Sequence, residues 1–526
     1  MLERSESTGG NSRHVNLLSS VRAIATLARL VRRQAVVLSI IDGFAAFLGR
    51  YCWAAAGEPH ASRAAGTTDA WPNASQSEVD PMTADSKGHR PSADCTLNIP
   101  RLINLALLVF LLPFLVLSPS CSNSQYKTGK HPIARKASVS HVKQGKPLGI
   151  VYVTNRAPSP SVDGKVSYSS FRGHSMSYGS VTLARKGSSL DVLHIAKRGE
   201  FPQSPYSIEL TGQGPRRVPA IVDAHLRAAS ALQREVNDRL AKAKRKEVVV
   251  FIHGYNNSFD DAAKATGKIC NTLSVEFVCV SLSWPAGGAG GAFYGYNIDR
   301  ESGEFAVLDL KKAIRTLSAA NRVKRLHLIA HSRGADVLLS ALHQLGMEGY
   351  ITRTSLGERY KINNVVLFAP DVDLDVATTK LFGFVSDPDA PFGTRASPYG
   401  LLPPVGSLHL TVYSSPNDKA LALSSALFGS VVRLGRLTST SIGSKAASSN
   451  ALWSNSQISG VVDFIEYEGN AGFSGHSYFL SDPAVQQDLD ALLRGRLKAG
   501  DPRRLLVETK PPFWKFVGRT HQTVGD

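Results

Sequence analysis

The sequence is poor in cysteine. Its 526 residues include only five cysteines, an odd number, and no two of them form a C-x-x-C pair. We therefore expect neither a metal framework nor a disulfide framework. The sequence also has no zinc-finger pattern and no platform of aromatic and basic residues, which argues against nucleic acid as a specific partner.

No apolar stretch is long enough to indicate a membrane-spanning helix with confidence. Residues 36–48 are interrupted by Asp42, and the apolar run 102–117 is shorter than the ~20 residues that such a helix needs. This second run follows Arg101 and leads through small residues to Cys121, as in a secretory signal. It resembles a bacterial lipoprotein signal in which Cys121 is lipidated. An uncleaved N-terminal anchor is the alternative.

Both readings of this signal hold the folded part at a membrane. We expect a protein of the cell envelope, anchored or lipidated, that faces the periplasm. Because the signal lies so far along the chain, we also expect the native product to start downstream of residue 1, at Met82.

The overall composition describes a large globular protein. Hydrophobic residues make up 43% of the chain, and the formal net charge is +18. Such a chain can bury a large core, either in two to four domains or in one large domain with extensions. The positive charge is spread over many loops, so it bears on solubility and non-specific binding rather than on chemistry.

From about residue 148 onward, apolar runs typical of strands alternate with helical periodicity. We expect strands at residues 149–154, 178–183, 190–196, 248–252, 277–282, 326–330, 365–368, 408–413 and 461–465. We expect helices that start at Pro219 and at residues 260–273, 304–317, 335–345 and 483–493. The alternation predicts an α/β fold with a mostly parallel sheet and helices on both faces.

A serine lies at the turn between one of these strands and the next helix. In RLHLIAHSRGADVLLSALHQL, residues 325–345, Ser332 is flanked by the small residues Ala330 and Gly334. This pattern is typical of the nucleophile elbow G-x-S-x-G, in which the turn is too tight for large neighbours. The alternative is that Ser332 only caps the helix.

Another group of residues that could take part in catalysis lies directly after a different predicted strand. His253, Gly254, Tyr255 and Asn256 come directly after the strand 248–252, where an oxyanion hole is expected. The backbone N–H groups of Tyr255 and Arg333 are its candidate donors. The alternative for this segment is an ordinary turn.

A candidate acid and a candidate base complete the set. Asp418 follows the strand 408–413, and His476 follows the last strand, so the chain order is Ser332, Asp418, His476. This is the order found in hydrolases with a nucleophile elbow. Asp371, which follows the preceding strand, is the alternative acid.

Several separated segments carry a resemblance to a known family. They are VYVTNR (151–156), VVVFIHGYNNSF (248–259), SLSWPAGG (281–288), YNIDRES (296–302), LIAHSRG (328–334), FAPDVDLDV (368–376) and GHSYFLSDPAV (475–485). Together they resemble a bacterial α/β-hydrolase family classed as a domain of unknown function, over roughly residues 147–495. The resemblance implies an α/β-hydrolase fold and a serine hydrolase whose serine, acid and histidine match Ser332, Asp418 and His476. It implies no substrate.

We therefore divide the chain into five parts. They are an extension of low order (1–100), a signal or anchor (101–121), a polar linker (122–147), an α/β-hydrolase domain (148–497) and a basic C-terminal tail (498–526). We expect residues 287–295 and 381–405 to be long loops that cover the site or are only surface excursions. We expect residues 428–458 to be a mobile surface loop. We expect the tail to be disordered, and the alternative is that its aromatic residues Phe513, Trp514 and Phe516 contact a membrane surface.

The predicted function is hydrolysis of an ester or related acyl substrate, as in carboxylesterases and lipases. The substrate would be a small molecule or a lipid, and the mechanism requires no metal or organic cofactor. Arg333 beside the serine places a positive charge near the pocket, which favours acidic or phosphorylated substrates. The alternative is a non-catalytic envelope protein that keeps the fold as a binding module.

Overall fold

The computed structural model describes residues 146–517, apart from short internal gaps. The gaps are residues 161–164, 188, 289–290, 353, 384–385, 388–407, 431, 444–452, 454–459 and 470–474. All described residues belong to one compact unit that starts at Pro132. The predicted extension, signal segment and Cys121 lie outside the described residues, as does most of the predicted loop 381–405. Within the described part, no helix is both long and apolar enough to cross a membrane.

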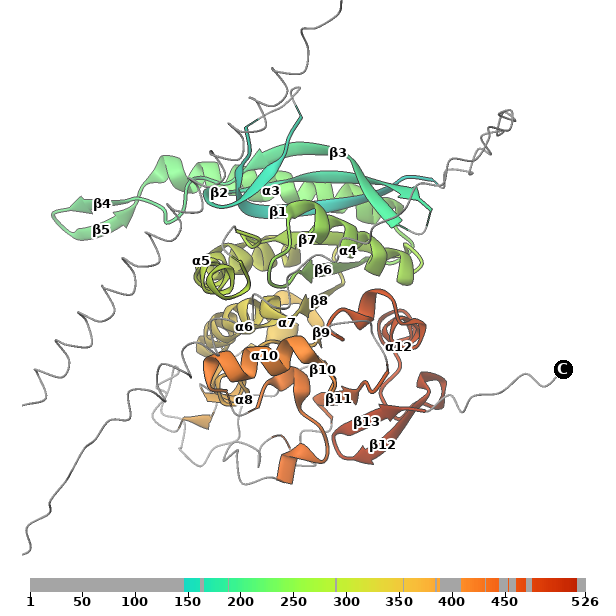
Figure 1. The fold of residues 1–526 in the computed structure, drawn as a ribbon. Helices are drawn as coiled ribbons and strands as arrows, with labels where there is room; N and C mark the ends of the chain where they lie inside the picture. The colour runs from blue at the N-terminus through green and yellow to red at the C-terminus, as the bar shows by residue number, and fades with distance from the viewer. Residues whose placement is uncertain are drawn as a thin grey trace, which may run out of the picture. The chain divides into compact units, whose positions relative to one another are not determined.

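The central sheet has eleven strands in the order β12-β13-β11-β10-β9-β8-β6-β7-β1-β2-β3 (Figure 1). Its eight inner strands, from β13 to β1, are parallel to their neighbours, and the outer pairs are antiparallel. The strands are β1 (Leu148–Pro158), β2 (Tyr168–Lys186), β3 (Ser189–Glu200), β6 (Glu247–Ile252), β7 (Val278–Ser283), β8 (Arg325–His331), β9 (Ile362–Phe368), β10 (His409–Ser414), β11 (Val462–Glu466), β12 (Leu506–Lys510) and β13 (Phe513–Phe516).

Helices cover both faces of this sheet. The main ones are α3 (Pro219–Lys242), α4 (Phe259–Thr272), α5 (Gly291–Ser318), α6 (Arg333–Ile351), α10 (Lys419–Phe428) and α12 (Pro483–Leu493). Apolar residues of α3, α5 and α6 form one core cluster with the sheet, and those of α4 and α12 form another. The mostly parallel sheet with helices on both faces, predicted from the sequence, is confirmed.

Strand β6 shows why a central strand carries an unbroken apolar run, here Val248 to Ile252. Val248, Val250 and Ile252 belong to the first core cluster, whereas Val249 and Phe251 belong to the second. Since neighbouring side chains of a strand point to opposite faces, a strand covered on both faces must be apolar at every position.

Local signals set the ends of the helices. Ser258 and Asp261 form a capping box at the start of α4, in which each side chain accepts a hydrogen bond from the other's backbone N–H, both at 3.1 Å. Asp482 caps α12 directly before Pro483. Such caps satisfy N–H groups that the first turn of a helix leaves without partners.

The expectation of a disordered C-terminal tail is wrong for residues 506–516. Strand β13 pairs in parallel with β11, and β12 pairs with β13. Phe513 is fully buried and stacks on Phe464 of β11, with ring centroids 4.7 Å apart. Burying a side chain of this size stabilises the fold by about 2 kcal/mol. This burial keeps the short strand in place, although the basic residues around it had suggested a disordered tail.

The absence of disulfides expected from the cysteine count is also wrong. Cys270 of α4 is bonded to Cys279 of β7, and both residues are buried in the core cluster of α4 and α12. The sequence motifs did not predict this disulfide because it joins a helix to the following strand and does not form a C-x-x-C turn.

Two expected loops are partly ordered. Helix α5 starts at Gly291, within the predicted loop 287–295. In the predicted mobile loop 428–458, a 3₁₀ helix (Leu434–Arg436) lies against the core, with Leu434 fully buried. Gly435 packs so closely on the backbone of Ala369 that a Cβ atom there would lie 2.7 Å from it. The small residues that suggested mobility therefore serve close packing here.

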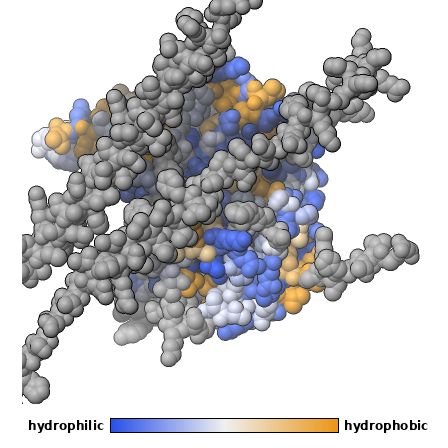
Figure 2. Space-filling model, in the orientation of Figure 1, coloured by the Kyte–Doolittle hydropathy of each residue, from blue (hydrophilic) through white to orange (hydrophobic). Residues whose placement is uncertain are grey.

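A separate two-stranded hairpin projects from the sheet. It consists of β4 (Ile208–Thr211) and β5 (Gly214–Arg217), and the sequence analysis did not anticipate it. Ile208 is 62% exposed and Leu210 is 82% exposed, and Figure 2 shows hydrophobic colouring on the hairpin.

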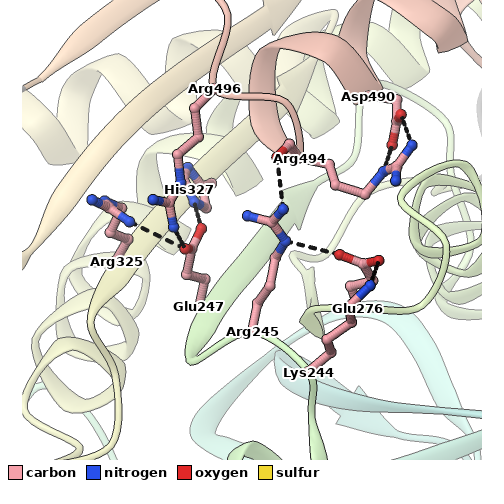
Figure 3. A network of polar contacts seen from close by, with 9 residues as sticks. All are labelled: Lys244, Arg245, Glu247, Glu276, Arg325, His327, Asp490, Arg494 and Arg496. Atoms are coloured by element: carbon pink, nitrogen blue, oxygen red, sulfur yellow. Dashed lines mark hydrogen bonds and ion pairs between the residues drawn. The ribbon is translucent and has the colours of Figure 1, made fainter.

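Charged side chains gather where the central strands begin (Figure 3). Glu247, the first residue of β6, is buried and accepts hydrogen bonds from His327 of β8 at 3.0 Å and from Arg325 at 3.2 Å. Arg496, which follows α12, also donates to Glu247. Nearby, Arg245 donates to Glu276 and to the carbonyl of Arg494. This network fastens the segment after α12 to the beginning of the strands.

Candidate functional site

Ser332 occupies a strained turn between β8 and α6. Its backbone has φ 52° and ψ −128°, a positive φ that non-glycine residues adopt only where the surroundings enforce it. A Cβ atom on Gly334 would lie 2.2 Å from the carbonyl oxygen of His253, so only glycine fits there. The Ser332 side chain makes no capping hydrogen bond to α6. This geometry is that of a nucleophile elbow rather than of an ordinary helix cap.

Asp418 and His476 are joined by a hydrogen bond. His476 Nδ1 donates to Asp418 Oδ2 at 2.7 Å, and Asp418 Oδ1 accepts from the backbone N–H of Leu421 at 2.9 Å. Asp418 thus also caps α10, which fixes its carboxylate at both oxygens. Gly475, at φ 65°, brings the turn before His476 close to the carbonyl of Asn417. The two side chains come from turns after β10 and β11, as the chain order suggested.

The alternative acid, Asp371, is engaged elsewhere. Its Oδ2 accepts a hydrogen bond from the Tyr296 hydroxyl at 2.6 Å, and its Oδ1 accepts one from Ser424 at 2.8 Å. Arg433 lies 3.6 Å away and balances its charge. Asp371 therefore holds α5 and α10 together, and Asp418 is the carboxylate that pairs with the histidine.

His331, beside the serine, supports the histidine instead of acting as a base. Its ring lies 4.7 Å from the His476 ring, and its Nε2 donates to the His476 carbonyl oxygen at 3.1 Å. Burial lowers the pKa of His331 well below the usual range, so the ring is neutral. Among the described residues, no hydrogen bond joins the Ser332 hydroxyl to the His476 ring. Such bonds are commonly long in ligand-free enzymes and shorten with substrate bound.

The segment that carries Tyr255 lies directly on the serine. A Cβ atom on Gly254 would be 2.7 Å from the Cβ of Ser332, so the approach requires glycine. Asn256 has φ 55°, and its N–H donates to Asp299 Oδ2 at 2.8 Å. The segment therefore forms a tight, fixed turn over Ser332.

The Arg333 side chain does not present an uncompensated charge. It is buried, pairs with Asp336 at 2.8 Å and lies 6.0 Å from the Tyr296 ring centroid. Lys380 also binds Asp336, at 2.7 Å. These residues line a pocket of about 330 Å³, together with Arg433. Since Asp336 balances Arg333, the side chain gives little support to the expected preference for anionic substrates.

Sequence reasoning did not single out Arg156 and Asp299, and it placed His253 in the oxyanion segment without giving its side chain a role; all three are buried polar residues beneath the turn. All three lie in segments that carry the family resemblance. That resemblance was the available signal, but it named no role for them. They come from β1, the end of β6 and α5, so only the folded chain brings them together.

No metal centre is evident in the described part of the chain, where no group of three or more His, Cys, Asp or Glu side chains is arranged to hold an ion. The site consists instead of a serine, a histidine–carboxylate pair and backbone N–H groups.

Comparisons with known proteins agree with this architecture. A family model described as "Alpha/beta hydrolase of unknown function (DUF900)" matches residues 228–496. A search of curated proteins found no match.

Among solved structures, three similar ones are a predicted CIB-like hydrolase from Thermoplasma acidophilum, Est1E from Butyrivibrio proteoclasticus with bound ferulic acid, and the carboxylesterase CesB from Bacillus subtilis. Their sequence identities are 14%, 9% and 11%, and their TM-scores are 0.23, 0.25 and 0.22. The matches cover 47%, 48% and 47% of this chain and 86%, 90% and 84% of the other chains.

Proposed function

Since the chain belongs to the α/β-hydrolase family of unknown function that its residues 228–496 match, we propose that it is a serine hydrolase of acyl substrates. Its fold is the α/β-hydrolase fold. The observation that carries the proposal is the 2.7 Å hydrogen bond from His476 to Asp418, at the same edge of the sheet as the strained Ser332.

In the proposed mechanism, Ser332 Oγ attacks the carbonyl carbon of an ester while His476 takes the hydroxyl proton. Asp418 holds the imidazole in the tautomer with a proton on Nδ1, which leaves Nε2 to act as the base. The carbonyl oxygen becomes negative and is stabilised by the N–H groups of Tyr255 and Arg333. His476 then protonates the leaving alcohol, and a water molecule hydrolyses the acyl-enzyme by the same steps.

We further propose that the protein works in the cell envelope, held by the segment 101–121 or by a lipid on Cys121. The buried Cys270–Cys279 disulfide supports this location, because disulfides persist in oxidising compartments outside the cytosol. Lipidation is checked by mass spectrometry of the membrane fraction, beside Cys121→Ser.

Labelling with a fluorophosphonate probe tests the activity most directly. The wild-type protein is expected to react and to hydrolyse p-nitrophenyl esters of short or medium acyl chains, whereas Ser332→Ala and His476→Ala are expected to do neither. Thermal melting of all three proteins controls for folding. Well-folded wild-type protein that neither labels nor turns over an ester would contradict the proposal and favour the binding-module alternative.

A further inference from the structure

A single arginine lies beneath the turn that carries the proposed oxyanion donor. Arg156 of β1 is almost completely buried, and its hydrogen bonds all go to neutral acceptors. Nε donates to Ser283 Oγ at 2.7 Å, and Nη1 donates to the carbonyls of Ala286 and Ser169. Nη2 donates to the Asn257 carbonyl at 2.6 Å and faces His253 Nε2 at 3.3 Å.

These contacts use every donor of the side chain. A guanidinium has five N–H groups in a fixed plane, and each has an acceptor here. Burial lowers the pKa of Arg156 to about 10, although the nearby charge of Asp299 acts in the opposite direction. The residue therefore remains charged at neutral pH, and a lysine, with three donors and no planar fork, cannot reproduce the set.

Arg156 helps to fix the tautomer of His253. The Nε2 atom of His253 faces Arg156 Nη2 and also accepts from the backbone N–H of Trp284 at 3.1 Å. An Nε2 atom that accepts hydrogen bonds carries no proton, so the proton of the neutral ring is on Nδ1. Burial and then the Arg156 charge lower the pKa of His253 to about 3, which agrees with a neutral ring.

The His253 proton in turn orients a peptide group. Nδ1 donates to the Gly254 carbonyl oxygen at 2.9 Å. In a trans peptide the C=O and the following N–H point in opposite directions, so this bond sets the direction of the Tyr255 N–H. The next two groups along the turn are held as well, because Asn257 Nδ2 donates to the Tyr255 carbonyl and the Asn256 N–H donates to Asp299.

We propose that Arg156 is a positioning residue of the oxyanion hole, which acts through the tautomer of His253 and the carbonyl of Asn257 to aim the Tyr255 N–H. The inference rests on the proposed serine hydrolase activity and adds a function for a residue that touches neither substrate nor Ser332.

The test compares Arg156→Lys with the wild-type full chain in ester hydrolysis and in inhibition by an alkyl boronic acid. This inhibitor becomes tetrahedral and anionic when Ser332 Oγ adds to boron, so it reports on oxyanion binding. Loss of one oxyanion donor costs ~10²–10³ in turnover. For a donor that is misaimed we expect kcat to fall about 10- to 100-fold, with KM nearly unchanged and the inhibition constant raised in proportion.

Arg504→Lys is the matched control. Arg504 is also a buried arginine, but it pairs with Asp488 through two bonds of 2.8 Å next to β12. We expect it to lower the melting temperature and to leave kcat and the inhibition constant unchanged. Should Arg156→Lys fail to fold, Ser283→Ala is the second variant. It removes the acceptor of Nε and the 3.4 Å contact of Ser283 Oγ with His253 Nε2, and it is expected to lower kcat by ~3- to 10-fold with the same pattern.

Folded Arg156→Lys with wild-type kcat and wild-type boronic acid affinity overturns the inference and leaves the proposed function standing. The same holds if kcat falls equally in Arg156→Lys and Arg504→Lys, since the effect is then only general loss of stability. A wild-type protein without esterase activity or probe labelling removes the proposed function, and this inference with it.

Discussion

A histidine paired with a buried carboxylate occurs at both edges of the central sheet. At the carboxyl ends of the strands His476 Nδ1 binds Asp418 at 2.7 Å, and at the opposite edge His327 Nε2 binds Glu247 at 3.0 Å (Figure 3). The distances alone do not separate these pairs, although the His327 side chain is 1% exposed and that of His476 is 15% exposed.

Their surroundings do separate them. The second ring nitrogen of His327 accepts a hydrogen bond from Asn364 at 2.9 Å, and Arg325 and Arg496 surround Glu247. Among the described residues, no hydrogen bond engages the second ring nitrogen of His476, and His331, the residue before the strained Ser332, packs against the His476 ring. A histidine–carboxylate pair thus suits proton transfer only when one ring nitrogen remains open toward a nucleophile. The His327–Glu247 pair, in which both ring nitrogens are hydrogen-bonded, therefore has a structural role.

The largest expected effect is that of Asp418→Asn. An amide in this place favours the wrong imidazole tautomer, and the comparable change in a known Ser-His-Asp enzyme lowers kcat by ~10⁴. Asparagine is also a good N-cap, so α10 and the melting temperature should be preserved. Ester turnover and thermal melting measure both. A fall in kcat smaller than tenfold would mean that the His476–Asp418 pair has no catalytic role that distinguishes it from the His327–Glu247 pair.

The matched change at the other edge is Glu247→Gln. It leaves the cations of a buried network without their carboxylate, a type of change that costs ~3–5 kcal/mol of stability. We expect urea unfolding to show a loss of this size, with kcat of the folded enzyme within about twofold of wild type. A large fall in kcat without a loss of stability would reverse the assignment of the two pairs.

The same network predicts a dependence of stability on pH. Burial acts against the charged form of Glu247, but the hydrogen bond from His327 and the nearby Arg496 lower its pKa to about 2. The folded pKa lies below the unfolded value of about 4.3, so this contribution is complete above pH ~4.3 and is lost as the pH falls toward ~2. We expect it to reach at most about 3 kcal/mol.

Unfolding measured between pH 5 and pH 2 checks this prediction. Glu247→Gln should show a flatter dependence than wild type over this window. Parallel curves for the two proteins would show that other carboxylates cause the acid sensitivity.

Asp371→Asn should have the smallest effect of the set. Because Asp371 binds Tyr296, Ser424 and Arg433 rather than His476, we expect kcat to fall less than about tenfold, through a slight loosening of the pocket. Steady-state kinetics beside Asp418→Asn make the test. Equal losses in both variants would restore Asp371 as a candidate acid.

Much of the fold follows from local patterns in the sequence. The run from Val248 to Ile252 predicts a buried strand because every side chain is apolar, and α12 begins at Pro483 as its cap predicts. The turn around Ser332 was recognisable because its motif is local in the sequence, although the steric demand for Gly334 comes from the carbonyl oxygen of His253 after another strand. Asp418 and His476 were identified by their position after strands, and their contact follows from the parallel topology.

Other features depend on contacts between distant segments. The Cys270–Cys279 disulfide requires the register of α4 against β7, which no spacing rule encodes. Strand β13 is only four residues long, FWKF, and it becomes a strand through its pairing with β11. The link between Arg156 and His253 joins residues 97 positions apart, so the sequence alone could indicate that these residues matter but not how.

The pairing of β13 with β11 also sets a limit on how far the protein can be shortened in the laboratory. A fragment that ends at residue 496, where the family match ends, would leave one side of β11 without its hydrogen-bond partners and would uncover Phe464. Open, apolar strand edges of this kind recruit other chains. Such a fragment should therefore aggregate during purification, and the shortest well-behaved form should extend through Phe516.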